Sequence, residues 1–302
     1  MDKTIASGDG LRRIAVAIRG AKLSFELDGA VVFGSMAKGK VTPDSDVDVL
    51  VVGRGLPPKR QRRSAQVIEI KRLVPMPLDV FLLTPQETDS NFANHNPLFL
   101  DIAEDGIILF DRNGKLAEMM QSMRRYVRDR GIVRMDDGWL FPVTYGSLTY
   151  LSKVSNRDFA LAMLNDATRD NEIAERLMSD GFCAKSVYHF QQAAEKAVKA
   201  VLIAMGVFRK THLIGSALRE MAQGGGIDQR WQSALLQAAE LSEELEPDVG
   251  LSRYPAIIND ALWLPSEEYT LEDAAAASEK AGKVLETARR FIADWFAQPP
   301  PH

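Results

Sequence analysis

The stretch that decides the fold is Gly34–Val52, which reads GSMAKGKVTPDSDVDVLVV. It starts where a short β-rich run, Ala30–Gly34, ends in Gly-Ser, and it closes with a second strand-like run, Val47–Val52. The residues between the two runs are rich in Gly, Pro and Ser and predict a loop, with about one helical turn after the Gly-Ser pair. Two aspartates, Asp46 and Asp48, therefore stand at the mouth of the second strand.

Outward from this stretch, helix and strand signals alternate. Apolar residues at helical spacing predict a helix over 11–27, and a Pro-Pro pair announces another over 56–73. A strand over Leu78–Leu83, a helix over 96–105 and a closing strand over 106–110 follow. Strands that alternate with helices in this way favour an α/β or α+β domain with a small mixed sheet.

The pattern changes beyond about residue 155, where every strong signal is helical. Helices are expected over 157–178, 184–205, 212–222, 228–245 and 271–296. Between the two regions, an Arg-rich helix over 114–131 is followed by DDGWLFPVTYGS, which is typical of a connection. The sequence therefore predicts an α/β domain over residues 1–112, a linker or connecting helix over 113–154, and an all-α helical bundle over 155–298.

Composition narrows the class of protein. Of the 302 residues, 46% are apolar and 26% charged, which excludes disordered and fibrous classes. The single cysteine, Cys183, permits no internal disulfide, and no apolar run approaches the roughly 18 residues that span a bilayer. We expect a cytoplasmic protein with no membrane partner. Residues 1–135 hold 21 basic and 17 acidic residues and the remainder 16 and 24, so a polyanionic ligand suits the first half.

The acidic residues carry the expected chemistry. Alternate residues of a strand share a face, so Asp46 and Asp48 point the same way, about 7 Å apart. Asp79 opens the next strand in PLDVFLL and could stand about 5 Å from them. Carboxylates this close repel one another, which makes a hard divalent cation such as Mg²⁺ their natural partner. The alternative is a solvated turn, because a DSD sequence before a strand is also common there.

The Gly-Ser pair suits a phosphate. Gly34 lets the backbone approach an anion closely, Ser35 supplies a hydroxyl and an N–H, and Lys38 adds a positive charge. Together with the acids, these residues are typical of phosphoryl transfer to an acceptor hydroxyl. The nearby basic run Lys59–Arg63 is read as a solvated helical face, so nucleic acid is not the favoured partner.

These motifs resemble the minimal nucleotidyltransferase (MNT) family of the DNA polymerase beta superfamily, over roughly residues 10–112. The resemblance implies that Asp46 and Asp48 are metal ligands, and that Asp79 is a third ligand or the base toward the acceptor. It also implies that Gly34 and Ser35 bind the triphosphate. Many members have Arg where this chain has Lys38, so a bidentate phosphate fork is absent.

The helical half resembles a HEPN domain over roughly residues 155–296. The segments that carry the likeness are SVYHFQQAAEKAVKAVLIAMG, THLIGSAL and LSRYPAI. The first is amphipathic: it places His189, Gln192, Lys196 and Lys199 opposite an apolar stripe. HEPN ribonuclease toxins carry an Arg four to six residues before a His, and no His in this chain has one. Ribonuclease activity is therefore not expected.

The sequence thus predicts a Mg²⁺-dependent nucleotidyltransferase that moves a nucleoside monophosphate, AMP from ATP in the first instance, to a hydroxyl of a small molecule or a protein and releases pyrophosphate. The alternative is a nucleotide-binding regulatory module related to MNT/HEPN toxin–antitoxin systems, without RNase activity. The apolar helical faces leave room for a homodimer. The general base stays open between Asp79 and a carboxylate of the helical half such as Glu195.

Overall fold

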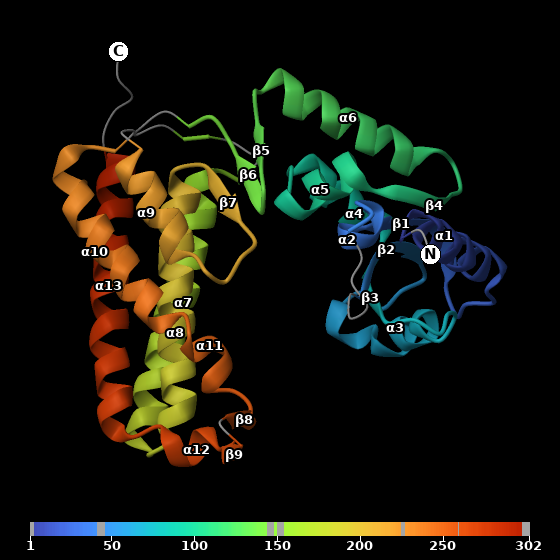
Figure 1. Ribbon diagram of the computed structural model, residues 1–302. Coiled ribbons are helices and arrows are strands. Elements are labelled where there is room, and N and C mark those ends of the chain that lie inside the picture. The colour runs from blue at the N-terminus through green and yellow to red at the C-terminus, as the bar shows by residue number, and fades with distance from the viewer. Residues whose placement is uncertain are drawn as a thin grey trace. The chain divides into compact units, whose positions relative to one another are not determined.

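The computed structural model describes residues 3–40, 46–143, 148–149, 154–224, 227–258 and 260–297, with side chains from residue 10 onward. The chain forms two compact units, Met1–Gly131 and Ile132–His302 (Figure 1). Asp44 and Ser45 of the expected loop, and the expected domain end at residue 298, lie outside the described residues.

The first unit is built on a four-stranded mixed sheet in the order β3-β2-β1-β4 (Figure 1). Its strands are β1 (Glu26–Phe33), β2 (Val47–Arg54), β3 (Leu78–Leu83) and β4 (Ile107–Asp111). The central strand β1 runs antiparallel to β2 and β4, whereas β2 and β3 are parallel. A parallel pair needs a crossover, and the segment between β2 and β3 supplies it with a 3-10 turn, η1 (Arg60–Arg62), and helix α3 (Ser64–Lys71).

Both faces of this sheet are covered. On one face, α1 (Lys3–Gly20) and α3 pack against a core made of alternate strand residues. That core includes Ile14, Ile18, Ala30, Val32, Val49, Val51, Ile70 and Leu82. On the other face lie α4 (Pro85–Ala93), α5 (Pro97–Asp105) and α6 (Lys115–Asp129). Strands buried on both sides explain the near-continuous apolar runs of β1 and β2.

Three expectations for this unit change. The helix expected over 56–73 is shorter, because only Ser64–Lys71 forms α3 and a 3-10 turn precedes it. The helix over 11–27 ends at Gly20, and residues 26–27 already belong to β1, because Glu26 and Leu27 pair with the end of β2. The Arg-rich helix expected in the connection is α6, and it packs on α5 and β4. Four of its side chains are buried at helical spacing, so it belongs to the core of the first unit: Leu116, Met120, Met123 and Val127.

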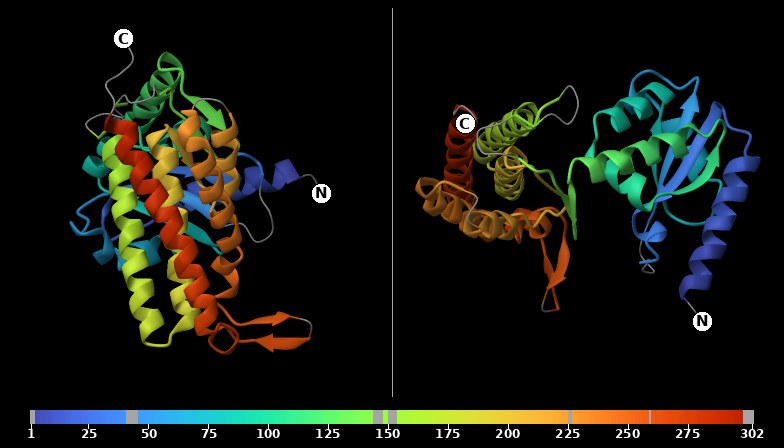
Figure 2. Two further views of the ribbon diagram at one scale, coloured as in Figure 1. Left: turned by 90° about the vertical axis from the view of Figure 1, so that its left-hand side faces the viewer. Right: turned by 90° about the horizontal axis from the view of Figure 1, so that it is seen from above.

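The second unit is a helical bundle, and its helices match the periodicity of the sequence (Figure 2). They are α7 (Asn156–Ser179), α8 (Cys183–Ala204), α9 (Gly215–Gln223), α10 (Gln229–Leu245) and α13 (Leu271–Ala297). Helix α8 packs against α7, α13 and α10 and lies at the centre. Its expected apolar stripe is confirmed, because Val187, Phe190, Ala194, Ala197, Val201 and Met205 are all buried.

Short strands also belong to the second unit. Part of the expected connection forms β5 (Val133–Met135) and β6 (Gly138–Leu140), which pair with each other. β6 also pairs with β7 (Val207–Arg209), which follows the central helix. Trp139 of β6 is 1% exposed, so tertiary burial decides this sheet rather than local pattern. Among the described helices, none is both long and apolar enough to cross a membrane.

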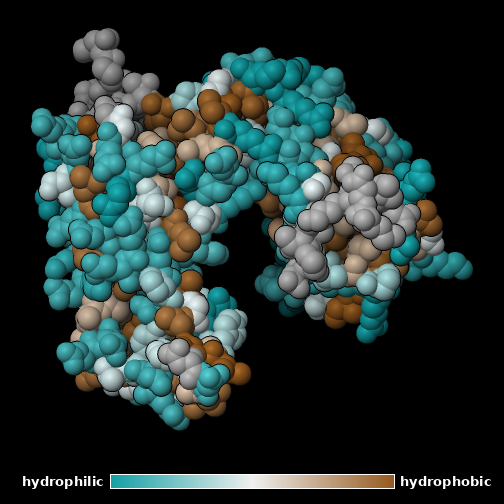
Figure 3. Space-filling model, viewed as in Figure 1, coloured by the Kyte–Doolittle hydropathy of each residue, from teal (hydrophilic) through white to brown (hydrophobic). Residues whose placement is uncertain are grey.

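A β-hairpin near one end of the bundle consists of β8 (Ala256–Ile258) and β9 (Ala261–Trp263), between the short helices α11 (Asp248–Leu251) and α12 (Pro265–Glu268). It projects from the helices in Figure 2. Ile257 and Leu262 face each other across the strands and are 81% and 64% exposed. Hydrophobic residues accordingly reach the surface around this hairpin in Figure 3.

Candidate functional site

The centre of the candidate site is the contact between Gly34 and Asp48. Gly34 follows directly after β1, starts the single helical turn α2 (Gly34–Ala37), and has a φ of 70°. Its α-carbon lies against the Asp48 side chain, so a β-carbon at this position would overlap the carboxylate oxygen Oδ2. Both the positive φ and the close approach require glycine at this position. The contact places the Asp48 carboxylate beside Gly34, near the start of β2.

Strand register brings the second carboxylate alongside. Asp48 pairs with Phe33 of β1 on one side and with Asp79 of β3 on the other, so these three side chains share one face of the sheet. Adjacent strands lie about 4.8 Å apart, which makes Asp48 and Asp79 immediate neighbours. Asp48 is half-buried and Asp79 is exposed. The two carboxylates therefore lie where the buried part of this sheet face meets the solvent.

Asp46 precedes β2 by one residue and is exposed. Across the described ranges, no three His, Cys, Asp or Glu side chains form a group that could hold a metal ion by themselves. Mg²⁺ is commonly held by one or two carboxylates together with substrate phosphates and water. The hard oxygen donors of Asp48 and Asp79, with Asp48 seated in the cradle that Gly34 leaves, fit such a cation.

The residues expected to hold the triphosphate lie in and just after α2. Ser35 is half-buried within the turn, and its carbonyl accepts a hydrogen bond from Lys40 N at 2.9 Å. Lys38 is engaged elsewhere, because its Nζ forms an ion pair of 3.3 Å with Asp105 at the end of α5. The side chains of this pair are 30% and 18% exposed. Asp105 is therefore a charged neighbour of the site that sequence reasoning missed.

The basic run before α3 is not a uniform solvated face. Arg63 is 2% exposed and donates from Nη1 to Glu87 Oε2 at 2.6 Å and from Nη2 to Glu87 Oε1 at 3.1 Å. It also donates to the carbonyls of Pro57, Pro58 and Leu82. Burial alone would raise the pKa of Glu87, but hydrogen bonds from Arg63, Thr84 and Arg60 lower it to about 2. Arg63 is thus a structural residue.

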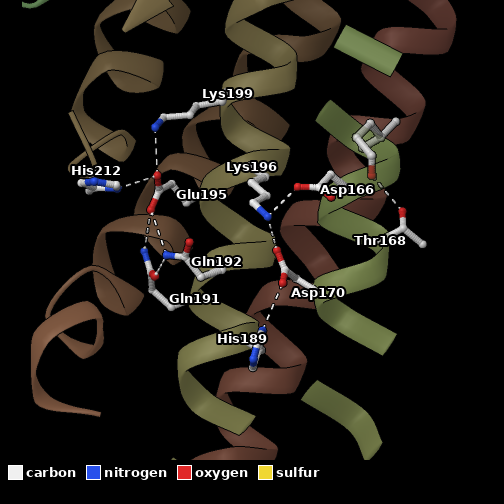
Figure 4. Close-up of polar contacts among 11 residues, drawn as sticks. Asp166, Thr168, Asp170, His189, Gln191, Gln192, Glu195, Lys196, Lys199 and His212 are labelled. Atoms are coloured by element: carbon white, nitrogen blue, oxygen red, sulfur yellow. Dashed lines mark hydrogen bonds and ion pairs between the residues drawn. The ribbon is translucent and has the colours of Figure 1, made fainter. Parts of the chain in front are cut away.

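The second unit holds a polar network along α8, centred on the buried carboxylate of Glu195 (Figure 4). His212 Nδ1 and Lys199 Nζ each lie 2.9 Å from Oε1 of Glu195, and Gln191 Nε2 donates to Oε2 at 3.2 Å. Gln192 Nε2 also donates to Oε2, at 3.3 Å. Burial opposes the charge of Glu195, yet the Lys199 hydrogen bond and charge, with His212 and Gln191, lower its pKa.

Because Glu195 is ionised and its oxygens already accept four hydrogen bonds, it has no free lone pair facing a substrate hydroxyl. The lowered pKa makes Glu195 a weak base. Its role is to join α8 to the segment that leads into α9, through His212.

A second polar cluster is centred on Asp170 of α7, which pairs with polar residues of α8. Lys196 Nζ contacts Asp170 Oδ2 at 2.5 Å and Asp166 Oδ2 at 2.6 Å, and His189 Nδ1 lies 3.1 Å from Asp170 Oδ1 (Figure 4). The polar face of α8 is therefore partly buried and hydrogen-bonded. Its partners, Asp166 and Asp170, lie in another helix, so no local pattern marks them.

Comparison with protein families matches both units. Residues 19–108 match the nucleotidyltransferase domain model, and residues 160–292 match the HEPN domain model. A protein of Methanocaldococcus jannaschii, named "Putative toxin MJ1304", is 36% identical over 141 residues, which cover 47% of this chain and 93% of that protein.

Two solved structures are also similar. TT1696 from Thermus thermophilus is 23% identical with a TM-score of 0.36, covering 44% of this chain and 97% of that one. A nucleotidyltransferase-like protein from Exiguobacterium sibiricum is 14% identical with a TM-score of 0.41, covering 93% of this chain and 74% of that one.

Proposed function

Because this chain belongs to the family that joins a nucleotidyltransferase domain to a HEPN domain, we propose that it transfers a nucleoside monophosphate from a triphosphate, ATP in the first instance, to a hydroxyl of a small-molecule or protein acceptor and releases pyrophosphate. The observation that carries this proposal is the row of carboxylates at the sheet edge. Asp48 is held against Gly34 and stands in register with Asp79, at the expected position of the family's acidic pattern.

The proposed roles follow from position. Asp46, Asp48 and Asp79 would hold Mg²⁺, which would offset their mutual repulsion and supply positive charge for phosphate oxygens. Gly34 and Ser35, at the start of the turn that follows β1, present backbone N–H groups and a hydroxyl to the triphosphate. Lys38 is the nearby cation, and it has to exchange Asp105 for a phosphate oxygen to take part.

Asp79 has the proposed role of receiving the proton of the acceptor hydroxyl. It is exposed, whereas Asp48 on the neighbouring strand is half-buried, and the helical alternative Glu195 is fully occupied by hydrogen bonds. The proposed location of the reaction is the cytoplasm, which the single cysteine favours. The HEPN unit has the proposed role of selecting the acceptor.

The test is transfer of label from ATP carrying ³²P at the α-phosphate, with Mg²⁺, to the protein itself, to extract proteins and to small-molecule fractions. Asp46→Ala, Asp48→Ala and Asp79→Ala are compared with Asp129→Ala, which removes an exposed carboxylate at the end of α6. Label that appears with the wild type and Asp129→Ala, and disappears with the three site variants, supports the proposal. Transfer that survives Asp48→Ala contradicts it.

A second candidate function is favoured by the similarity to a protein named as a toxin. In this alternative the chain is a regulatory module in which nucleotide binding controls a partner, and the HEPN unit has no RNase activity. The same experiment separates the two. ATP that binds in a Mg²⁺-dependent way, without label reaching any fraction, favours the regulatory module.

A further inference from the structure

An aromatic pair lies beside the carboxylates of the candidate site, and the roles proposed above leave it unused. Phe81 is two residues after Asp79 on β3, so the two side chains share one face of the sheet. The ring centroid of Phe81 lies 5.6 Å from that of Phe33, at an interplanar angle of 59°. Phe33 is the residue of β1 that pairs with Asp48. The aromatic pair and the carboxylates are therefore neighbouring parts of one surface.

The two rings differ in how much of them the solvent reaches. Phe33 is 3% exposed, whereas Phe81 is only half-buried and belongs to an edge strand of the sheet. Leu50, which pairs with Phe81 from the neighbouring strand β2, is fully buried. Phe33 and Leu50 therefore support the Phe81 ring from the core, and part of that ring stays accessible to a ligand. A ring held in this way loses little further freedom when a ligand stacks on it.

The proposed substrates differ in what they offer an aromatic ring. A nucleoside triphosphate carries an aromatic base, whereas an acceptor needs only a hydroxyl. The proposed roles place the triphosphate at Gly34 and Ser35, after β1, and its α-phosphate near Asp48 on β2. A nucleotide that runs from β1 across β2 brings its nucleoside toward β3. Phe81 lies about 7 Å along β3 from Asp79, so the base and the acceptor hydroxyl meet different positions of this strand.

We propose that Phe81, backed by Phe33, is the platform on which the base of the nucleoside triphosphate stacks. This inference rests on the proposed transfer function and adds to it the class of nucleotide. Stacking strength grows with the area of the base, so the platform favours purine over pyrimidine triphosphates. A phenylalanine side chain forms no hydrogen bond with a base edge, so Phe81 by itself does not distinguish adenine from guanine.

The test measures equilibrium binding to the full-length protein by isothermal titration calorimetry, in the presence of Mg²⁺. The probes are the α,β-methylene analogues of ATP, GTP, CTP and UTP, in which the bond that transfer would break is replaced by a stable one. Inorganic tripolyphosphate is the probe without a base. Phe81→Leu removes the ring and keeps an apolar side chain, and Phe81→Trp enlarges the ring.

Phe110→Leu is the matched control. Phe110 is also a half-buried phenylalanine of this sheet, but it pairs with Ala30 and packs against the core on the opposite face. We expect the wild type and Phe110→Leu to bind the two purine analogues more tightly than the two pyrimidine analogues. Phe81→Leu is expected to bind the ATP analogue about tenfold more weakly and tripolyphosphate as tightly as the wild type does. Phe81→Trp is expected to bind the ATP analogue more tightly, because the stacked area is larger.

Two results would overturn the platform and leave the proposed function in place. One is an unchanged affinity of Phe81→Leu for the ATP analogue. The other is an equal loss of affinity for the ATP analogue and for tripolyphosphate, which would make Phe81 a support of the fold or of the phosphate end. The thermal midpoint of each variant without ligand shows whether it is folded. If Phe81→Leu has a lowered midpoint, Phe81→Trp decides, and an affinity no higher than that of the wild type overturns the platform.

Failure of the proposed function gives a different result. A wild-type protein that binds none of the triphosphates in the presence of Mg²⁺ contradicts the proposed function, and the platform with it. This result is obtained from the wild type alone, so it is distinguishable from an effect that is missing only in the Phe81 variants.

Discussion

The Asp48 side chain occupies the space that a β-carbon at Gly34 would need. This contact joins the end of β1 to the start of β2, at the edge of the sheet where Asp48 and Asp79 stand side by side in the strand register. The glycine is therefore as much a part of the candidate site as the carboxylates.

Gly34→Ala is expected to abolish nucleotidyl transfer and to lower stability. The positive φ alone costs roughly 1 to 2 kcal/mol, and the displaced Asp48 carboxylate adds a functional loss. Gly39→Ala is the control, because Gly39 has a φ of 66° and open space around its α-carbon. It is expected to lose similar stability, measured by urea unfolding, and to keep its activity. Equal activities in the two variants would count against the role of Gly34.

Mg²⁺ is expected to raise the thermal midpoint of the wild type, because a ligand that binds only the folded state stabilises it. Asp48→Asn and Asp79→Asn are expected to lose this Mg²⁺-dependent rise, whereas Asp129→Asn is expected to keep it. The measurement is a series of thermal unfolding curves against Mg²⁺ concentration, with EDTA as the metal-free reference. A Mg²⁺ response that persists in Asp48→Asn would place the ion elsewhere.

Lys38 is paired with Asp105, so a triphosphate has to compete with that carboxylate for the ammonium group. Asp105→Asn is expected to tighten ATP binding several-fold, and Lys38→Ala to weaken it by about tenfold. In the Lys38→Ala background, Asp105→Asn is expected to have little further effect. The three variants form a double-mutant cycle, measured by direct titration with ATP. Additive effects in the cycle would show that the pair is not in competition with the nucleotide.

The ion pair between Arg63 and Glu87 is expected to make the stability of the first unit depend on pH in the acid range. The pKa of Glu87 is lowered to about 2 in the folded protein, below its ordinary value of 4.5. Its contribution to stability is therefore present above pH 4.5 and is lost as the pH falls from about 4.5 to about 2. Glu87→Gln is expected to flatten this part of the stability curve, measured by urea unfolding at a series of pH values.

Substitution of Arg63 tests the same ion pair with Glu87 by removing the other partner. Arg63→Ala is expected to cost about 3 kcal/mol at pH 7, because Glu87 loses a partner that is almost fully buried. Arg62→Ala removes the exposed neighbouring arginine and is expected to leave stability unchanged. A cost shared equally by the two variants would show that general charge, not the Arg63 contact, is responsible.

Glu195 is expected to matter far more than a surface glutamate with a similar lysine neighbour. Glu195→Gln removes the charge that Lys199 and His212 share in a buried position, at an expected cost of about 2 kcal/mol. Glu279 forms an exposed pair with Lys283 at the same i,i+4 spacing, and Glu279→Gln is expected to leave the urea midpoint unchanged. Equal midpoints for the two variants would contradict the structural role of the network.

Part of the fold could be read directly from local pattern. β3 matches the predicted strand Leu78–Leu83 residue for residue, and the apolar stripe of α8 is buried as its spacing predicts. The three-stranded sheet of β5, β6 and β7 could not be predicted from local pattern, because the long helices α7 and α8 separate β6 from β7 along the chain. Strands this short are stabilised by burial of Trp139 rather than by their own sequence.

The sequence by itself determined the chemistry of the candidate site: which residues are acidic, that a glycine and a serine end β1, and that two aspartates flank the start of β2. Only the tertiary structure decided the partners. It placed Asp79 beside Asp48, paired Lys38 with Asp105, and buried Arg63 against Glu87. The physical reason is distance along the chain: periodicity specifies which face a side chain takes, whereas strand register and helix packing specify what meets it there.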